Sequence, residues 1–391
     1  MEKIGLVVRQ YGREVNGGGE DHCRAIAEHL KPYYGVEVLT SSSREYPYND
    51  YYPSGMELID GISVRRFSVK REIDFRRREL LEKQMLEGEL SEEEWLTECG
   101  PYCPDLIDYL DQHREDYKCV LFFSYSNYLT CKGLELELPN AVFIPLAHDE
   151  RNLYWPIYKK VFKKPAAFLF NTDEERDLVD KLFRIEDRPY QVGIFGLDET
   201  AGKQEPLPES YASLRPYILY AGRVTYTKNY QELNRYFLEY KERHKTDLKL
   251  IVTGRIRTGF PLLYHEDIIY AGFVPEEEKR ALLGHAVCLA LPSKNESLSI
   301  VTLESFMQER PVLVNGRCPV LEGHCKRGNA GLYYTNYAEF EAELDYFLEH
   351  PDVADQMGRN GRRYVEENYQ WDKVVSNILG LIEEVGNHEG S

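Results

Sequence analysis

The sequence has little that would carry the chain into or across a membrane. No stretch approaches the roughly 20 consecutive apolar residues that span a bilayer. The apolar run at residues 4–8 is too short for a signal-peptide core, and no small-residue cleavage site follows it. That run therefore predicts a buried first strand, and we expect a cytoplasmic protein.

Paired cysteines are also missing. The chain has eight cysteines, and none forms a C-x-x-C pair. Cys99 and Cys103 lie four apart and Cys318 and Cys325 seven apart, but no second matching pair completes a zinc pattern. Isolated thiols of this kind are usually small core residues in a reducing cytosol. The sequence gives no reason to expect a metal ion or another cofactor.

Positive charge is scarce. Lys and Arg number 48 against 66 Asp and Glu, for a formal net charge of −18. Binding to a nucleic-acid backbone depends on Lys and Arg displacing counterions, so the negative charge argues against nucleic acid as the main partner. The 42% hydrophobic content is that of a globular protein, and 391 residues are too many for one ordinary core.

Strand-like and helix-like segments alternate along the chain, which predicts an α/β protein with parallel sheets covered by helices. A polar stretch at 198–216, interrupted by Gly and Pro, indicates a linker between two similarly wound halves. The charged span 71–98 predicts exposed helix. The expected strands are 4–8, 36–40, 62–67, 119–124, 142–145, 167–171, 217–221, 248–253, 268–271, 287–291 and 311–314.

The segment 291–306 carries the strongest chemical motif. An apolar strand ends at Leu291, a polar loop contains Glu296, and a helix begins near Ser299 and runs through Glu304. A helix that starts at the carboxyl end of a parallel strand presents unpaired N–H groups, which suits a phosphate. The two glutamates would accept hydrogen bonds from sugar hydroxyls. The alternative is two solvated glutamates on a surface helix, and the spacing favours neither.

A second motif follows the strand that ends at Ala221. Gly222 allows a tight turn, and Arg223 and Lys228 flank a short loop before the next helix. Arg holds a diphosphate through its planar fork and Lys supplies a point charge. Isolated cations are more often surface residues, but these two lie at a carboxyl end, where α/β sheets place their ligands.

Two weaker motifs lie in the first half. Three glycines, Gly17–Gly19, follow the first strand and let the backbone approach a ligand closely. Their spacing is not G-x-G-x-x-G, which disfavours a nicotinamide or flavin enzyme. His148 follows the strand at 142–145 and would bond a sugar or acceptor hydroxyl, with Asp149 orienting it. A flexible glycine loop and a merely satisfied histidine are the alternatives.

In chain order the four motifs are Gly17–Gly19, His148-Asp149, Gly222-Arg223 with Lys228, and Glu296-x7-Glu304. Together they resemble glycosyltransferase family 4, a group of retaining enzymes with the GT-B fold. The resemblance spans nearly the whole chain, and the pair Glu296-x7-Glu304 with the upstream Gly222-Arg223 and Lys228 is its most specific part. It implies two facing Rossmann-like domains with a cleft between them. Residues 1–198 would hold the acceptor, 199–370 the nucleotide-sugar donor, and 371–391 would form a helix that crosses back to the first domain.

The resemblance also implies roles for single residues around the donor. Arg223 and Lys228 would grip the diphosphate and Glu296 would contact the transferred sugar. Backbone groups of three consecutive residues would contact its hydroxyls and phosphates, namely Leu298, Ser299 and Ile300.

The remaining contacts implied by the family concern the nucleoside and the first domain. Glu304 would bind the ribose, and the backbone of Phe273 and Val274 would meet the base. Gly18 would lie close to the diphosphate and His148 close to the sugar. Many relatives have glycine where this chain has Ser299, and we expect this serine to act as a helix N-cap.

The predicted reaction moves a sugar from a nucleoside diphosphate to an acceptor hydroxyl with retention and without a metal. The acceptor is a glycan, a lipid-linked molecule or a small molecule. A sugar-nucleotide epimerase or hydrolase of the same fold, and a non-catalytic paralogue that binds the donor, are the alternatives.

Two basic segments in the first half raise the hypothesis of peripheral docking on an anionic membrane. The segment 155–164 mixes Trp155, Tyr158 and Phe162 with four lysines. The alternative is a solvated helix whose aromatic residues pack inward. The other segment contains Arg65, Arg66, Lys70, Arg71, Arg76, Arg77 and Arg78.

Overall fold

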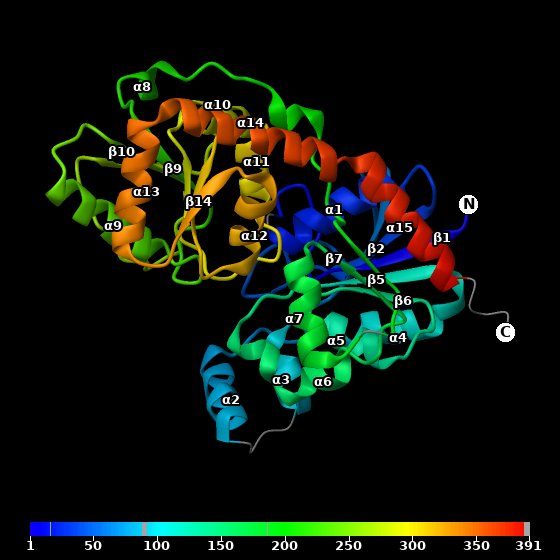
Figure 1. The fold of residues 1–391 in the computed structure, drawn as a ribbon. Helices are drawn as coiled ribbons and strands as arrows, with labels where there is room; N and C mark the ends of the chain where they lie inside the picture. The colour runs from blue at the N-terminus through cyan, green and yellow to red at the C-terminus, as the bar shows by residue number, and fades with distance from the viewer. Residues whose placement is uncertain (16, 88–91, 186, 387–391) are drawn as a thin grey trace. The chain divides into compact units, whose positions relative to one another are not determined.

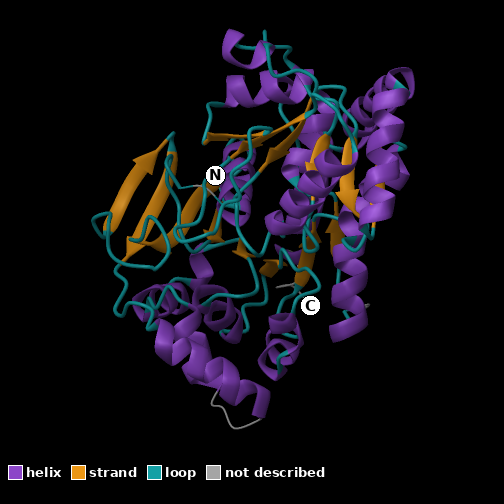
Figure 2. Cartoon of the chain, turned by 90° about the vertical axis from the view of Figure 1, so that its left-hand side faces the viewer, coloured by secondary structure: helices purple, strands orange, loops and turns teal. Residues whose placement is uncertain are grey.

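The structure is a computed structural model that describes residues 1–15, 17–87, 92–185 and 187–386. It divides into two compact units, one of Met1–Phe195 with Trp371–Ser391 and one of Gly196–Gln370. In both units helices and strands alternate along the chain and loops join them (Figure 2). The last five residues of the predicted tail, 387–391, lie outside the described ranges.

The first unit is built on an eight-stranded sheet, in which every neighbouring pair is parallel except β3 and β4. In sheet order the strands are β3 (Gly55–Ile59), β4 (Ile62–Phe67), β2 (Gly35–Ser41), β1 (Lys3–Val7), β5 (Cys119–Phe123), β6 (Ala141–Ile144), β7 (Ala167–Phe170) and β8 (Tyr190–Val192).

Both faces of this sheet are covered, which is why its central strands are continuous apolar runs. Successive side chains of β5 alternate between the faces: Leu121 and Phe123 join one core cluster, and Val120 and Phe122 join the other. The helices are α1 (Gly18–Leu30), α2 (Phe75–Glu87), α3 (Glu92–Cys99), α4 (Pro104–Gln112), α5 (Tyr128–Glu135), α6 (Pro156–Val161), α7 (Asp173–Phe183) and α15 (Trp371–Gly386), with 3₁₀ turns Arg114–Asp116 and Arg151–Tyr154.

The C-terminal helix α15 packs within this first unit, beside α1 (Figure 1). Its apolar face, including Ile378 and Ile382, is buried in the core cluster that contains Ile26 of α1. The Trp371 ring stacks on His29 with centroids 3.7 Å apart. Burial of this apolar face fixes α15 to the unit that also contains the N-terminus.

The second unit has a six-stranded parallel sheet. Its strands in order are β11 (Ile268–Gly272), β10 (Lys249–Thr253), β9 (Tyr217–Ala221), β12 (Leu289–Leu291), β13 (Val312–Asn315) and β14 (Gly331–Tyr334). Its helices are α8 (Glu209–Ala212), α9 (Tyr230–Arg243), α10 (Glu276–His285), α11 (Ile300–Met307), α12 (Pro319–Gly328), α13 (Tyr337–Glu349) and α14 (Pro351–Asn368), after a 3₁₀ turn Glu199–Gly202.

The strand order reverses once in the second sheet, between β9 and β12. From β9 the chain adds β10 and β11 on one side, then returns to place β12 on the other side of β9. Ligands of open α/β sheets bind at such a switch point, outside the carboxyl ends of the strands. The corresponding reversal in the first sheet lies between β1 and β5.

The predicted α/β class is confirmed, but the strands β3, β8 and β14 and the burial of α3 were not predicted. The antiparallel edge strand β3 was not predicted, because its residues are mostly exposed and form no buried apolar run. The prediction of exposed helix at 71–98 is wrong for α3. Trp95 and Leu96 of α3 are 1% exposed and belong to the core of the first unit.

Candidate functional site

The loops that follow β9 and β12 meet in the second unit. Lys228 lies between β9 and α9, and Glu296 lies between β12 and α11. The Lys228 Nζ is 2.6 Å from Glu296 Oε1, and the two side chains are 26% and 12% exposed. Because β9 and β12 are neighbours, their carboxyl ends bring these two residues together at the switch point.

Arg223 lies at the same strand end, with an exposed side chain. The Tyr220 hydroxyl donates a hydrogen bond to the Arg223 carbonyl at 2.7 Å. Burial raises the pKa of Tyr220, the Glu296 carboxylate raises it further, and the Arg223 guanidinium lowers it. Both charges thus act on the Tyr220 hydroxyl.

Two glycines set the path of the Arg223 loop. Gly222 N donates to Thr253 O at 2.9 Å, and Gly254 N donates to Gly272 O at 2.7 Å, so three strand ends are tied together. Gly254 has φ +130°, and a Cβ there would overlap the backbone of Gly222. The close approach of two loops therefore requires glycine at 254.

The start of α11 differs from the prediction. Ser299 precedes the helix with φ +67°, and its side chain makes no capping hydrogen bond, so the N-cap prediction is wrong. Its hydroxyl pairs with Thr302 Oγ1 at 2.9 Å. A left-handed backbone is the conformation that glycine adopts most easily, which explains why glycine suits this position.

A buried histidine holds the residue before this turn. His324 of α12 donates from Nε2 to the Leu298 carbonyl at 2.8 Å and is 0% exposed. Burial lowers the pKa of His324 to about 4, so the ring is neutral at pH 7. Leu298, Ser299 and Ile300 are thus fixed where the helix presents its first N–H groups, which lack intrahelical partners. Nothing in the pattern of residues around His324 predicts this role.

Glu304 lies one turn into α11 and is paired. Lys279 of α10 places its Nζ 3.0 Å from Glu304 Oε1. Burial raises the pKa of Glu304, and Lys279 opposes that rise. Lys279 was not among the predicted site residues, because nothing in the sequence shows that α10 and α11 are neighbours.

The two residues predicted to meet the base follow β11 and differ in exposure. The Phe273 side chain is 64% exposed, and the Arg255 guanidinium lies 5.3 Å from its ring centroid. Val274 is buried, with 7% exposure. Phe273 therefore offers an aromatic face to solvent, in addition to the backbone groups that were predicted to act.

In the first unit, the glycine loop lies at the start of α1, which begins at Gly18. An added Cβ at Gly18 would meet no atom within 4 Å, whereas one at Gly19 would come within 3.1 Å of Leu146. Leu146 belongs to the loop after β6 that carries His148. The structure thus brings two of the predicted motifs of this unit side by side.

His148 faces a different carboxylate from the one predicted. Its Nε2 is 3.6 Å from Glu150 Oε2. Asp149, expected to orient the histidine, accepts a hydrogen bond from the Tyr154 hydroxyl at 2.7 Å. Glu150 is thus a second carboxylate near the His148 ring, and the orienting role of Asp149 stays a prediction.

Glu175 holds the loop that carries His148 through a backbone hydrogen bond. Its carboxylate accepts from Ala147 N at 2.6 Å and Asn171 N at 2.9 Å, and it is 1% exposed. Thr172 caps α7, because its hydroxyl oxygen accepts a hydrogen bond from Glu175 N. Burial nevertheless raises the pKa of Glu175 to about 8. Its reach to Ala147 links the ends of β6 and β7.

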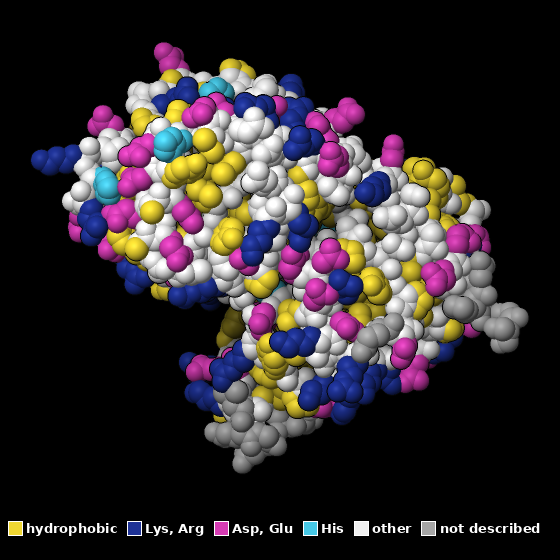
Figure 3. Space-filling view, in the orientation of Figure 1, with side chains coloured by type: hydrophobic (Ala, Val, Ile, Leu, Met, Phe, Trp, Pro, Cys, Tyr) yellow, Lys and Arg dark blue, Asp and Glu magenta, His cyan; other side chains and the backbone are white. Residues whose placement is uncertain are grey.

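The basic segment 155–164 has its aromatic residues inside. Trp155, Tyr158 and Phe162 are 6%, 0% and 1% exposed, so the inward-packing alternative holds. Lysines 160, 163 and 164 surround a shallow hollow with Glu137 and Arg188. In the other basic segment six side chains form ion pairs with carboxylates: Arg65, Arg66, Lys70, Arg71, Arg77 and Arg78. Cationic and acidic side chains are interspersed on the face shown in Figure 3.

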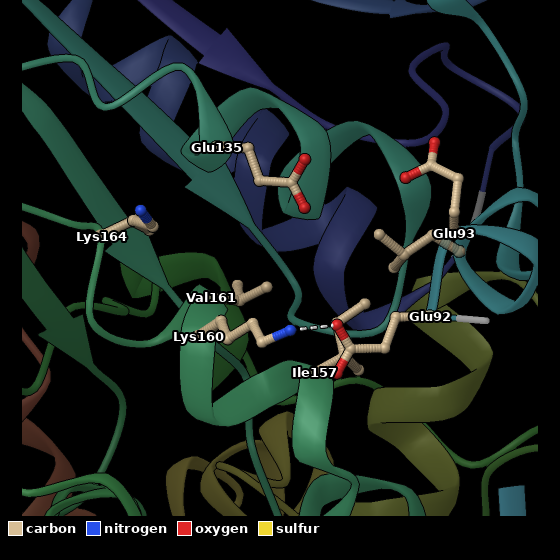
Figure 4. A pocket seen from close by; sticks show the side chains of 8 residues that line it. Glu92, Glu93, Glu135, Ile157, Lys160, Val161 and Lys164 are labelled. Atoms are coloured by element: carbon tan, nitrogen blue, oxygen red, sulfur yellow. Dashed lines mark hydrogen bonds and ion pairs between the residues drawn. The ribbon is translucent and has the colours of Figure 1, made fainter. Parts of the chain in front are cut away.

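A hollow of about 280 Å³ lies among α3, α5 and α6. Leu96, Ile157 and Val161 line it together with three glutamates and two lysines. Figure 4 shows Lys160 directed at Glu92, and their ion pair measures 2.5 Å. None of the predicted site residues borders this hollow, and both of its lysines form ion pairs, Lys160 with Glu92 and Lys164 with Glu137.

Within the described ranges no three His, Cys, Asp or Glu side chains are grouped as metal ligands would be. In the described part of the chain no helix is both long enough and apolar enough to cross a membrane. All eight cysteines are buried free thiols.

Two sheets that each reverse their strand order once define a doubly wound, Rossmann-like α/β protein. Residues 208–364 match the family model "Glycosyl transferases group 1". An uncharacterised glycosyltransferase of Methanocaldococcus jannaschii is 22% identical, covering 97% of both chains. The alpha-D-kanosaminyltransferase of Streptomyces kanamyceticus is 23% identical over 57% of this chain and 62% of its own length.

Solved structures show the same fold. Sucrose-phosphate synthase from Thermosynechococcus elongatus superposes with a TM-score of 0.73 at 14% identity, covering 98% of this chain and 99% of its own. Anabaena HepE in complex with UDP and glucose gives a TM-score of 0.65 at 12% identity, covering 98% and 100%. The fold is GT-B, and the family match and the relatives support a glycosyltransferase.

Proposed function

We propose that the protein is a retaining glycosyltransferase that moves a hexosyl group from a nucleoside-diphosphate sugar to an acceptor hydroxyl without a metal ion. One observation carries the proposal: Lys228 and Glu296 are paired at 2.6 Å, beside the start of α11. A cation for the leaving diphosphate, a carboxylate for sugar hydroxyls and helix N–H groups thus share one strand edge. Membership of glycosyltransferase family 4 stays a prediction.

The donor is held by the second unit in this proposal. Arg223, Lys228 and the first N–H groups of α11 stabilise the charge that develops on the leaving diphosphate. Removing one such donor group costs about 3 kcal/mol of activation free energy. Because the Lys228 ammonium is already placed by Glu296, little reorganisation accompanies charge development.

Transfer proceeds on the face from which the diphosphate leaves, through an oxocarbenium-like state. The anomeric carbon–oxygen bond to the diphosphate breaks, and the acceptor oxygen bonds to the anomeric carbon. The leaving phosphate takes the acceptor proton. A double displacement would need a carboxylate nucleophile at the anomeric carbon. Glu296 is bound to Lys228 and is expected at the far side of the sugar. The roles of His148 near the sugar and of Gly18 near the diphosphate stay predictions.

A thermal-shift screen tests the donor site. Nucleoside diphosphates and their sugars are added to wild type and to Lys228→Ala, beginning with UDP because HepE was solved with UDP and glucose. A ligand that stabilises wild type and not the variant identifies the donor. If no nucleoside diphosphate stabilises wild type, the proposal is wrong. Product analysis without acceptor then separates transfer from epimerisation or hydrolysis.

Peripheral docking on an anionic membrane is a separate part of the proposal. Since the aromatic residues of 155–164 are buried, the lysines of this segment and the neighbouring Arg188 would contact the lipid headgroups. Binding of that kind is electrostatic and weakens as salt rises. Sedimentation with anionic liposomes at low and high salt measures it, and absence of salt-sensitive binding removes docking without touching the transferase proposal.

A further inference from the structure

An ion pair between α10 and α11 lies one helical turn from the proposed diphosphate site. Lys279 Nζ is 3.0 Å from Glu304 Oε1 and 2.7 Å from Glu276 Oε2. The Lys279 and Glu304 side chains are 20% and 17% exposed, whereas Glu276 is 66% exposed. Lys279 therefore joins one solvated carboxylate and one largely buried carboxylate.

The Glu304 side chain is directed toward the start of α11. Side chains of a helix lean toward its N-terminus, and four residues of helix rise about 6 Å. The Glu304 carboxylate therefore lies beside the first turn, whose N–H groups are proposed to hold phosphate. A nucleoside diphosphate held there carries its ribose next to its phosphates, within reach of this carboxylate.

The protonation state of Glu304 decides what it can bind. An ionised carboxylate accepts hydrogen bonds through both oxygens, whereas a protonated one has less accepting capacity. Burial raises the pKa of Glu304, Glu276 raises it too, and Lys279 and Arg280 lower it. All three of these neighbouring charges belong to α10, and Lys279 is the one in direct contact.

We propose that Lys279 is a positioning residue that makes the donor site select ribonucleoside over 2′-deoxyribonucleoside diphosphates, by holding Glu304 as an ionised acceptor for ribose hydroxyls. The inference rests on the proposed function. A deoxyribose would leave a buried carboxylate without one of its donors. A site built to bond a hydroxyl rejects the analogue that lacks it.

The test compares affinities for ADP, GDP and UDP with those for their 2′-deoxy counterparts. The proteins are wild type, Lys279→Met, Lys279→Arg and Glu276→Gln. For the base that binds, wild type prefers the ribonucleotide about tenfold or more. Lys279→Met loses most of that preference while its affinity for the deoxynucleotide changes less than about twofold. Lys279→Arg restores the preference, because it keeps a cation beside Glu304.

Glu276→Gln is the matched control. It removes the solvated partner of Lys279 and leaves the Glu304 contact, so the ribose preference persists. The pH dependence gives a second readout. Without Lys279 the pKa of Glu304 rises, so the preference of Lys279→Met reappears only as pH is raised, while wild type shows it at lower pH.

The double variant Lys279→Met with Glu304→Gln tests whether Lys279 acts through Glu304. If Lys279 acts through Glu304, the double variant shows no less ribose preference than Glu304→Gln alone. The inference is overturned if Lys279→Met weakens ribo- and deoxyribonucleotides equally, or leaves the preference intact. If wild type binds no nucleoside diphosphate of either series, the proposed function itself fails, which is a different result.

Discussion

Lys228 and Glu296 are 68 residues apart in the sequence and lie 2.6 Å apart in the folded second unit. Their loops follow β9 and β12, which are neighbours in the sheet although two strands, β10 and β11, lie between them in chain order. Each residue restricts the position of the other's charged group. Lys228 is held ready for an anion, and Glu296, with 12% of its side chain exposed, has its charge balanced.

Replacing Lys228 by Ala is expected to lower kcat about 10²-fold, because a preorganised cation is lost from the leaving group. It also leaves the Glu296 carboxylate without its ion-pair partner, so we expect the donor to raise the melting temperature of the variant less than that of wild type. Steady-state kinetics with the donor found in the screen measure kcat. The exposed Lys245 of the same unit gives the control Lys245→Ala, which keeps full activity. Equal kcat in both variants would contradict the role of Lys228.

Gly254→Ala is expected to destabilise the second unit more than Gly259→Ala does. Both positions have positive φ, so both variants pay for the left-handed backbone. Only at Gly254 would the added Cβ overlap the backbone of Gly222, whereas at Gly259 it meets nothing within 4 Å. The difference in free energy of unfolding should be about 2 kcal/mol, as in overpacked cores. Urea unfolding measures it, and equal losses would mean that the two loops do not approach so closely.

Ser299→Gly is expected to be more stable than Ser299→Ala, by about 1 kcal/mol. Both variants lose the bond between the serine hydroxyl and Thr302. Glycine adopts φ +67° freely, while alanine keeps the strain. Thermal unfolding of the two variants provides the comparison. An alanine variant as stable as the glycine variant would show that the backbone before α11 is not strained.

Glu175 predicts a pH dependence of stability. Its pKa is raised to about 8 in the folded state, from an ordinary value near 4.5, by burial. Between these two values the folded state holds a proton that the unfolded state has lost. The contribution of Glu175 to the free energy of unfolding therefore falls as pH rises from 5 to 8, at most by about 1.4 kcal/mol per pH unit.

Urea unfolding of wild type and Glu175→Gln at pH 5, 6, 7 and 8 isolates this group, since the other titrations cancel in the difference. Wild type should lose stability relative to Glu175→Gln over that range. Asp177→Asn on the same helix, where Asp177 is 69% exposed, serves as the control and should run parallel to wild type. A difference that does not change with pH would contradict a raised pKa for Glu175.

The sequence predicted the doubly wound halves well because their central strands are buried on both faces. Strands such as β5 and β9 are unbroken apolar runs, and each can be recognised without its neighbours. β3 escaped detection because pairing with one neighbour at the sheet edge leaves Met56 and Leu58 exposed. The aromatic residues of 155–164 were ambiguous, since alternation of Lys with aromatics suits either a docking surface or a buried helix face.

Within the candidate site, the residues at strand ends were found and their partners were not. Gly222 and Arg223 stand directly after an apolar run and Glu296 lies in the short polar loop after another, so position alone marks them. Lys279 lies in the middle of a charged helix, and only the packing of α10 on α11 gives it a role. Glu150 was overlooked because the choice between it and Asp149 depends on the turn of the loop.

By itself the sequence determined which segments are strands and helices and which polar residues stand at their ends, because periodicity and turn chemistry act over a few residues. The tertiary structure decided which of those ends meet. Strand order within each sheet paired Lys228 with Glu296, helix packing paired Lys279 with Glu304, and burial of an apolar face assigned α15 to the first unit. These contacts join residues far apart in the chain, and only the burial of shared apolar surface fixes them.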